Sequence, residues 1–160
     1  MNIRIKNLTI TEYDELDKRK IRFIKDIKED QLVGRYVSNT MDEWLEDSRG
    51  LDKLLVGPAY IISDKRKLVG FIRMASLNKN GEVDLHYGVH PDFRKQGYGS
   101  KILLEVSNYL LKNTEYVKRI KLDIKEENKG SILCAENANF TLYNMIKTKQ
   151  DGNVLVYIKK

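Results

Sequence analysis

The sequence predicts a mixed α/β domain in which helices cover both faces of a mostly antiparallel sheet. Two β-type runs, "KLVGFIRMASL" and "GEVDLHYGV", are joined by the turn-like "NKNG". The segment "SKILLEVSNYLLK" then repeats apolar residues at helical spacing. The alternating strand "RIKLDIK" follows that helix. A strand meander followed by a helix and a further strand is typical of a mixed sheet packed between helices.

The N-terminal third predicts one strand and two helices. Residues 1–10 alternate polar and apolar side chains, as a half-buried strand does. Thr11 is the expected cap of the first helix, and a second helix is expected from Ser38 to Gly50. The expected apolar positions of the first helix are Leu16, Ile21, Phe23, Ile24 and Ile27.

The rest of the chain predicts six strands and two helices. A hairpin over residues 140–160 is expected to turn at Asp151-Gly152. The other expected strands are residues 59–63, 67–77, 81–89 and 119–125, and the expected helices are residues 100–112 and 128–139. The prediction is therefore about seven strands and about four helices. With 160 residues, no repeat and no linker, we expect a single domain spanning 1–160.

The charge balance favours an anionic partner. There are 29 Lys and Arg against 23 Asp and Glu, which gives a formal net charge of +6. Such a surface suits nucleic acid or a phosphorylated cofactor. The cations are scattered among carboxylates, as in "EYDELDKRK", and no basic arm or base-stacking motif is present. Nucleic acid is therefore the less favoured partner.

Cysteine usage and hydropathy point to the cytoplasm. Cys134 is the only cysteine, so neither an internal disulfide nor a thiolate metal cage can form. The N-terminus does not have the pattern of a signal peptide, and no stretch approaches the ~18 apolar residues of a membrane span. We expect a cytoplasmic protein without membrane attachment.

The stretch "HPDFRKQGYGS" has the chemistry of a pyrophosphate cradle. A strand ending near Val89 and a helix starting near Gly99 leave backbone N–H groups unpaired at the helix entrance. Gly97 and Gly99 allow the main chain to approach a ligand, and Arg94 and Lys95 add positive charge.

Two familiar nucleotide motifs do not account for this stretch. The pattern G-x-x-x-x-G-K-[ST] is absent from the sequence. The dinucleotide fingerprint G-x-G-x-x-G requires a third glycine where Ile102 stands. These departures disfavour an NTPase or a hydride-transfer enzyme.

The glycine stretch resembles the R-x-x-G-x-G/A loop of GNAT acyl-CoA N-acyltransferases. Asn128, Ser131 and Phe140 resemble the N-x-x-S…G-F pattern of the second conserved block, especially in the ribosomal-protein-acetyltransferase-like branch. The resemblance implies a GNAT-like sheet, acetyl-CoA as co-substrate, and a thioester carbonyl polarised by the N–H of Val89. The implied cofactor-binding residues are Val89, Arg94, Lys95, Gln96, Gly97, Tyr98, Gly99, Ser100, Asn128 and Ser131.

The sequence departs from the family pattern at three points. Lys95 and Asn139 stand where glycines are common, although Asn tolerates a positive φ. Ala135 stands where many members have a tyrosine acid. Cys134 or Tyr143 could replace that acid, but a packing role is favoured for Cys134 and a core or hairpin-pair role for Tyr143.

The strand before the loop carries the candidate catalytic bases. Strand alternation places Asp84, His86 and Gly88 on one face. Asp84 falls where many GNAT members have a strand glutamate, and His86 is an alternative base or a wall of the cleft. His90 is expected to face solvent, and its separation of ~13 Å from His86 along a strand rules out a shared metal ion.

These features favour an N-acetyltransferase that transfers the acetyl group of acetyl-CoA directly to a primary amine in a ternary complex. The acceptor, a small molecule or a protein N-terminus, is left open. Trp44, Tyr36 and Arg35 could line its pocket, although Trp44 could instead anchor its helix. The alternative function is a non-catalytic acyl-CoA-binding sensor or interaction module. Exposed strand edges near the C-terminus are compatible with a homodimer.

Overall fold

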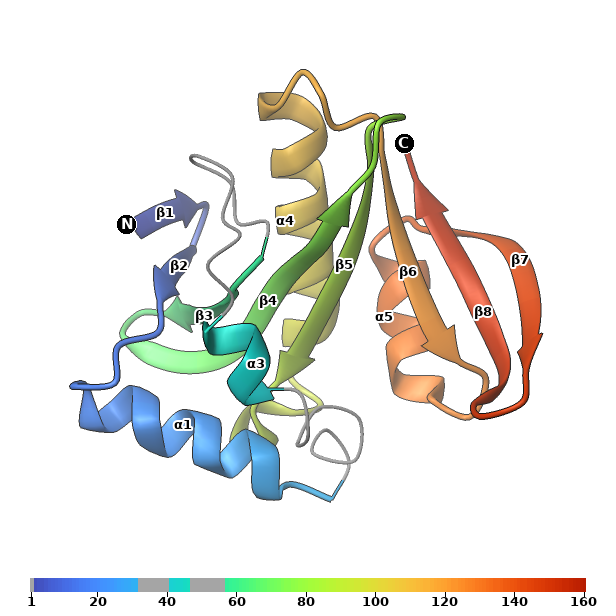
Figure 1. Ribbon diagram of the computed structural model, residues 1–160. Coiled ribbons are helices and arrows are strands. Elements are labelled where there is room, and N and C mark those ends of the chain that lie inside the picture. The colour runs from blue at the N-terminus through green and yellow to red at the C-terminus, as the bar shows by residue number, and fades with distance from the viewer. Residues whose placement is uncertain (1, 32–40, 47–56) are drawn as a thin grey trace.

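The computed structural model describes residues 2–31, 41–46 and 57–160. One eight-stranded sheet has the strand order β1-β2-β3-β4-β5-β6-β8-β7 (Figure 1). The strands are β1 (Asn2–Ile5), β2 (Leu8–Glu12), β3 (Ala59–Asp64), β4 (Lys67–Leu77), β5 (Glu82–Val89), β6 (Arg119–Lys125), β7 (Thr141–Thr148) and β8 (Gly152–Lys159). The described helices are α1 (Lys18–Glu29), α3 (Met41–Glu46), α4 (Tyr98–Asn113) and α5 (Lys129–Asn137), with a single 3-10 turn at Pro91–Phe93.

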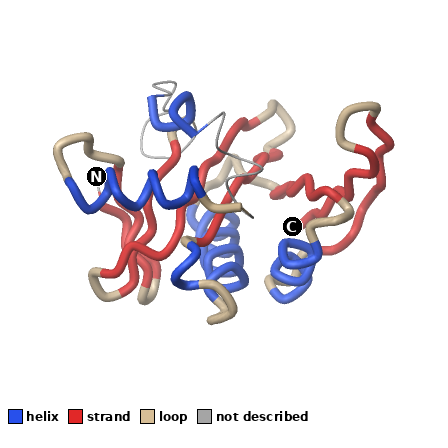
Figure 2. Tube along the Cα trace, turned by 90° about the horizontal axis from the view of Figure 1, so that it is seen from below, coloured by secondary structure: helices blue, strands red, loops and turns tan. Residues whose placement is uncertain are grey.

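The helices lie in two layers, one on each face of the sheet. Figure 2 shows α1 and α3 on one face and α4 and α5 on the other. The larger core cluster joins the sheet to α4 and α5 through residues such as Leu103, Leu110 and Ala135. A smaller cluster, including Ile27 and Phe71, packs under α1 and α3. The prediction of a mixed α/β sheet with helices on both faces is confirmed.

The sheet divides between β5 and β6. All other strand pairs are antiparallel, whereas β5 and β6 are parallel and pair only from Glu82↔Arg119 to Asp84↔Lys121. Beyond these pairs the two strands diverge, as Figure 1 shows. The second half of β5 therefore presents a strand edge without a partner on β6. The loop to α4 begins at the end of this unpaired segment.

The N-terminal prediction missed one strand. Residues 1–10 are not a single strand, because the chain reverses at Lys6, which has φ 52°. The resulting hairpin pairs Ile5 with Leu8, which gives eight strands rather than about seven. The turn holds neither Gly nor Pro, and its one visible signal is the polar pair Lys6-Asn7, which shifts the period-two pattern between Ile5 and Leu8.

The first helix starts later than predicted. Thr11 lies within β2, and Asp17 is the N-cap, whose side chain accepts hydrogen bonds from the backbone N–H groups of Arg19 and Lys20. Phe23, Ile24 and Ile27 are buried as predicted, but Leu16 and Ile21 are exposed. The helix α3 lies inside the second predicted helix; Ser38 and Gly50 fall outside the described residues.

The C-terminal half follows the sequence prediction closely. Asn139 adopts φ 68°, so it takes the left-handed conformation expected at this position. Phe140, which follows it, is buried in the core. The hairpin of β7 and β8 turns at Asp151 and Gly152, where Gly152 has φ 66°.

Candidate functional site

The N-terminus of α4 offers unpaired backbone donors. Gly97 is the N-cap with φ 82°, and no side chain caps the helix. The first intrahelical bond runs from the N–H of Lys101 to the carbonyl of Gly97 at 3.0 Å. The N–H groups of Tyr98, Gly99 and Ser100 therefore have no partner within the helix. Apart from its chain neighbours, a Cβ built on Gly97 would meet no atom of the described residues within 4 Å, so this turn is open to an approaching anion.

Gly99 packs closely against a second helix, a contact that the sequence analysis did not predict. A Cβ at this position would lie 2.7 Å from the Sγ of Cys134 on α5. The second glycine is therefore required for close packing of α4 on α5. Cys134 is accordingly a packing residue, and its neighbour Ala135 is fully buried.

Arg94 is held by an acidic partner. Its guanidinium makes a bidentate ion pair with Asp30, and one of the two contacts joins Nη1 to Oδ1 at 3.0 Å. Lys95 is exposed and has φ 59°, the conformation that the family glycine would adopt without strain. The side chain of Gln96 donates to the carbonyl of Asp92 at 3.2 Å. The free positive charge of the loop thus comes from Lys95 and the helix N-terminus.

His90 is buried, and the prediction that it faces solvent was wrong. Its Nε2 lies 2.9 Å from the Oδ2 of Asp26 on α1, and its ring stacks on Phe23 at 5.2 Å. Its Nδ1 accepts a hydrogen bond from the backbone N–H of Asp92 at 3.1 Å. Since Nδ1 is an acceptor, the proton of the neutral ring lies on Nε2 and is donated to Asp26.

The backbone of Val89 faces the divided part of the sheet. The N–H of the next residue, His90, donates to the carbonyl of Val69 on β4 at 2.8 Å. Successive N–H groups of a strand point to opposite edges. The N–H of Val89 therefore points to the edge from which β6 has diverged, where it can polarise a carbonyl.

Tyr87 bridges this part of the sheet, a contact that the sequence analysis did not predict. Its hydroxyl lies 2.8 Å from the Oγ of Ser131 on α5. Burial raises the pKa of Tyr87 far above that of an ordinary tyrosine, so the phenol stays protonated. Such a phenol is a poor proton donor toward a thiolate, and the contact that the structure gives it is the bridge from β5 to α5. Asn128 is the N-cap of α5, and its side chain accepts from the N–H of Ser131 at 3.2 Å.

Asp84 and His86 lie on the predicted face of β5, and His86 contacts Trp44 of α3 on that face. Burial raises the pKa of Asp84 from 3.8 to about 6. Burial, together with the charge of Arg73, lowers the pKa of His86 to about 4. Neither Oδ1 of Asp84 nor Nδ1 of His86 has a hydrogen-bond partner among the described residues. Two buried polar atoms without partners on one strand face are suited to a polar ligand.

Trp44 of α3 forms the wall beside these residues. Its ring lies 5.0 Å from that of His86 and 6.3 Å from that of Phe71. The guanidinium of Arg73 lies over the same indole at 5.0 Å. Trp44 thus anchors α3 on the sheet and also borders the site. The other expected pocket residues, Arg35 and Tyr36, lie outside the described residues.

Tyr143, one of the alternative acids, is exposed on β7. Its side chain is 66% exposed, and the guanidinium of Arg119 lies 5.4 Å from its ring. Of the two roles expected for Tyr143, the core position is therefore wrong; Tyr143 lies in the hairpin, at the irregularity between Leu142 and Asn144 in the pairing of β7 with β8.

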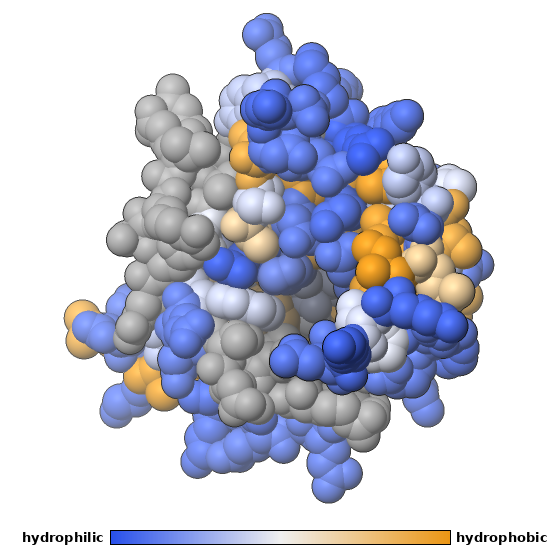
Figure 3. All heavy atoms as spheres, turned by 45° about the vertical axis from the view of Figure 1, so that its right-hand side comes forward, coloured by the Kyte–Doolittle hydropathy of each residue, from blue (hydrophilic) through white to orange (hydrophobic). Residues whose placement is uncertain are grey.

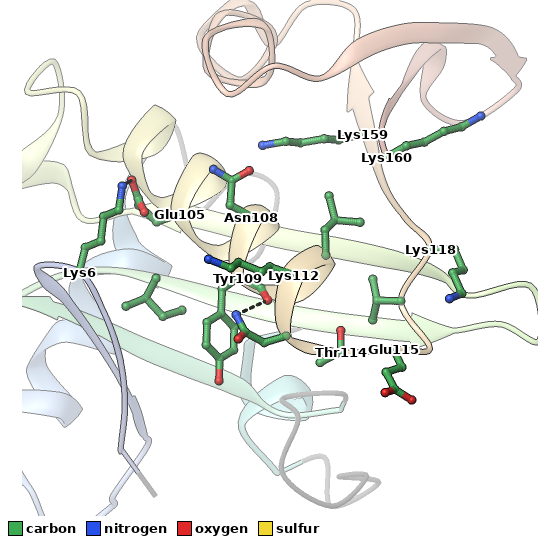
Figure 4. Close-up of a pocket in the computed structure, with 14 residues that line it drawn as sticks. Lys6, Glu105, Asn108, Tyr109, Lys112, Thr114, Glu115, Lys118, Lys159 and Lys160 are labelled. Carbon is green, nitrogen blue, oxygen red and sulfur yellow. Dashed lines mark hydrogen bonds and ion pairs between the residues drawn. The ribbon is translucent and has the colours of Figure 1, made fainter.

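A separate groove of about 940 Å³ lies at the opposite end of α4 from the loop (Figure 4). Lys112, Lys118, Lys159 and Lys160 are among its lining residues. Lys112 lies in the last turn of α4, where a cation complements the carbonyl end of the helix. No described helix is both long and apolar enough to cross a membrane.

The sheet is divided beside the N-terminus of α4, and the polar strand residues Asp84 and His86 lie on the face away from α4. This combination of fold and loop defines a class of acyltransferase. The model of the acetyltransferase (GNAT) family matches residues 21–140. The chain belongs to this family.

Solved structures show the same fold at low sequence identity. A GNAT-family acetyltransferase from Bacillus anthracis has a TM-score of 0.78 and 15% identity, with 99% of this chain and 98% of the other covered. The ribosomal alpha-N-protein acetyltransferase RimL, in complex with coenzyme A, has a TM-score of 0.72 and 16% identity over 99% and 97%. A chimera of the spermidine N-acetyltransferase SpeG from Vibrio cholerae and hSSAT has a TM-score of 0.69 and 14% identity over 96% and 94%. No curated protein sequence matches the chain.

Proposed function

We propose that this chain is a single-domain N-acetyltransferase that transfers the acetyl group of acetyl-CoA to a primary amine in a ternary complex, with Asp84 as the general base. The observation that carries this proposal is the carboxylate of Asp84. It is half-buried on the face of β5 opposite α4, has a pKa raised to about 6, and carries a buried oxygen without a partner among the described residues. A base of this pKa is suited to proton removal at physiological pH.

Asp84 is the better of the two candidate bases. An amine with a pKa near ~10 is protonated at neutral pH and must lose a proton before it attacks. With a pKa of about 6, Asp84 is mostly a carboxylate at pH 7 and can accept this proton. With a pKa of about 4, the imidazole of His86 is neutral but only weakly basic. His86 is therefore assigned to orienting the acceptor or a water molecule beside Asp84.

The main chain supplies the cofactor contacts in this proposal. The N–H groups from Gln96 to Gly99 bind the pyrophosphate of acetyl-CoA, with support from Lys95 and Ser100. The N–H of Val89 polarises the thioester carbonyl. Asn128 and Ser131, beside Tyr87, contact the pantetheine arm. When bound, acetyl-CoA supplies an activated acyl group and a thiolate leaving group.

A thiol-release assay with a panel of primary amines tests the proposal. The panel includes polyamines, amino acids, aminoglycosides and peptides with free N-termini, because the proteins of similar fold are named for different acceptors. Release of CoA that requires both acetyl-CoA and one of these amines supports the proposal. Saturable acetyl-CoA binding without thiol release for any amine would instead support a non-catalytic acyl-CoA sensor.

We also propose a cytoplasmic homodimer that forms through β7. Every residue of β7 is exposed, and four are large hydrophobic residues: Leu142, Tyr143, Met145 and Ile146. Figure 3 shows the apolar patch on this side of the molecule. Among the described residues β7 pairs only with β8, and two copies can pair antiparallel through the outer edge of β7 under twofold symmetry.

Light scattering tests this dimer. The wild type should give twice the mass of one chain, and Ile146→Lys should halve that mass. A monomeric wild type would refute the dimer.

A further inference from the structure

Three regularly spaced residues fix the loop between β5 and α4. His90 contacts Asp26 at 2.9 Å, Arg94 contacts Asp30, and the hydroxyl of Tyr98 donates to Asp64 at 2.8 Å. His90, Arg94 and Tyr98 are spaced four residues apart, and their three partners come from other segments of the chain. Asp26 lies in the last turn of α1, and Asp30 is its C-cap. Being four residues apart, the two acids lie on the same side of the helix. We refer to the contacts Asp26–His90 and Asp30–Arg94 as the α1 clamp.

The loop needs such a clamp because its backbone is strained. Lys95 follows Arg94 directly and adopts φ 59°, which costs an L-residue about 1 kcal/mol or more. Conformations of this kind persist only when surrounding contacts determine them. The Arg94 ion pair lies immediately before Lys95, and the Tyr98 hydrogen bond lies just after Gly97. The strained turn is thus held at both of its ends.

The Asp30–Arg94 contact is suited to orientation rather than to supplying charge. Both nitrogens of the guanidinium fork bind the two oxygens of one carboxylate. The side chains of Arg94 and Asp30 are only 25% and 11% exposed. A bidentate pair fixes a side chain in direction as well as in position. Neutralised by Asp30, Arg94 has little net charge to offer a phosphate.

We propose that Asp26 and Asp30 of α1 are positioning residues for the cofactor. They hold His90 and Arg94 so that the strained turn at Lys95 directs the N–H groups of Gln96 to Gly99 toward the pyrophosphate. Neither acid touches acetyl-CoA. The inference rests on the proposed use of acetyl-CoA. Because α1 also packs on the cluster containing Trp44 and Phe71, the clamp joins the acceptor side of the sheet to the cofactor loop.

Calorimetric titration of the full chain with acetyl-CoA tests the clamp. Asp30→Asn and Arg94→Gln should each weaken binding roughly tenfold, because a misdirected loop loses part of each N–H contact. The double variant should bind no more weakly than either single variant, since both remove the same contact. Glu29→Gln is the matched control: it changes the same charge on α1, but Glu29 is 66% exposed and, within the described part of the chain, its ion pair is with Lys25. This control should bind like the wild type.

Arg94→Lys separates orientation from charge. Lysine keeps the positive charge but loses the fork, so the clamp predicts binding as weak as that of Arg94→Gln. Normal binding by Arg94→Lys would assign Arg94 to the phosphate and overturn the inference. So would tighter or unchanged binding by folded Asp30→Asn, as judged by circular dichroism. If Asp30→Asn does not fold, the two Arg94 variants still decide. A wild type that binds no acetyl-CoA would overturn the proposed cofactor and, with it, this inference.

Discussion

The Oδ2 of Asp84 lies 3.8 Å from the Nε2 of His86, on the same face of β5. This distance is too long for a hydrogen bond, and the imidazole is neutral near pH 7, so the two residues are neighbours and not an ion pair. Burial raises the pKa of Asp84 to about 6 and lowers the pKa of His86 to about 4. The usual order of basicity of the two residues is therefore inverted at this site.

Asp84→Asn should reduce transfer by roughly a hundredfold or more, because the amine loses its base. For the wild type, kcat/KM should rise with pH to about 6, the pKa of Asp84, and then level off until the acceptor ammonium itself ionises. The variant should lack this rise. His86→Asn is the control and should keep it. A rise near pH 6 that survives in Asp84→Asn would assign the base elsewhere.

Asp84→Asn should also stabilise the protein at neutral pH. The folded pKa of about 6 exceeds the ordinary 3.8, so the folded state binds the proton more tightly than the unfolded state. The contribution of Asp84 to stability is therefore full below about pH 4 and is lost as pH rises through about 6. At pH 7.5 the buried carboxylate costs up to about 3 kcal/mol, which asparagine avoids.

Urea unfolding at pH 7.5 and pH 4 measures this effect. The free energy of unfolding of Asp84→Asn should exceed that of the wild type at pH 7.5, and the difference should vanish near pH 4. Asp123→Asn is the control, because the Asp123 side chain is 41% exposed and should change stability little. Equal stability of Asp84→Asn and wild type at pH 7.5 would show that the carboxylate is not destabilised by burial.

Substitutions at Gly97 separate backbone conformation from charge. Gly97→Ala introduces a Cβ that meets no atom of the described residues within 4 Å beyond its chain neighbours, but the alanine must adopt φ 82°, which costs about 1 kcal/mol. It should weaken acetyl-CoA binding only modestly. Gly97→Asp adds a carboxylate beside the pyrophosphate and should abolish binding. Titrations in which the two variants bind equally well would remove the loop from the cofactor site.

Gly99→Ala should destabilise the protein by about 1–3 kcal/mol, because the new methyl group would lie 2.7 Å from the Sγ of Cys134. The double variant Gly99→Ala/Cys134→Ala removes that sulfur and should recover most of the loss. Thermal unfolding of the single and double variants measures the recovery. Additive destabilisation in the double variant would contradict the packing role of Gly99.

Local sequence signals predicted most of the elements and the face of β5 that carries the site. Period-two alternation placed Asp84 and His86 together because the two faces of β5 pack against different layers. Asn139 was correctly expected to tolerate a positive φ, since that preference belongs to the residue itself. Such signals depend on a few adjacent residues, so they can be recognised in one sequence.

Contacts between distant segments could not be predicted in the same way. His90 was expected in solvent, but its partner Asp26 lies 64 residues away. The burial that raises the pKa of Asp84 depends on tertiary packing around β5, including charged residues of β4 and β6, which no local pattern encodes. The role of Gly99 likewise depends on Cys134 of another helix.

A calorimetric titration of the wild type with acetyl-CoA at moderate salt, with Gly97→Asp alongside, tests the central claim most directly. Saturable binding by the wild type, lost in Gly97→Asp, is the predicted result. It would place the cofactor at the N-terminus of α4, on the face of the divided sheet that carries α4 and α5. Absence of saturable binding by the wild type would contradict the account, because the glycine stretch would then be no more than a helix entrance.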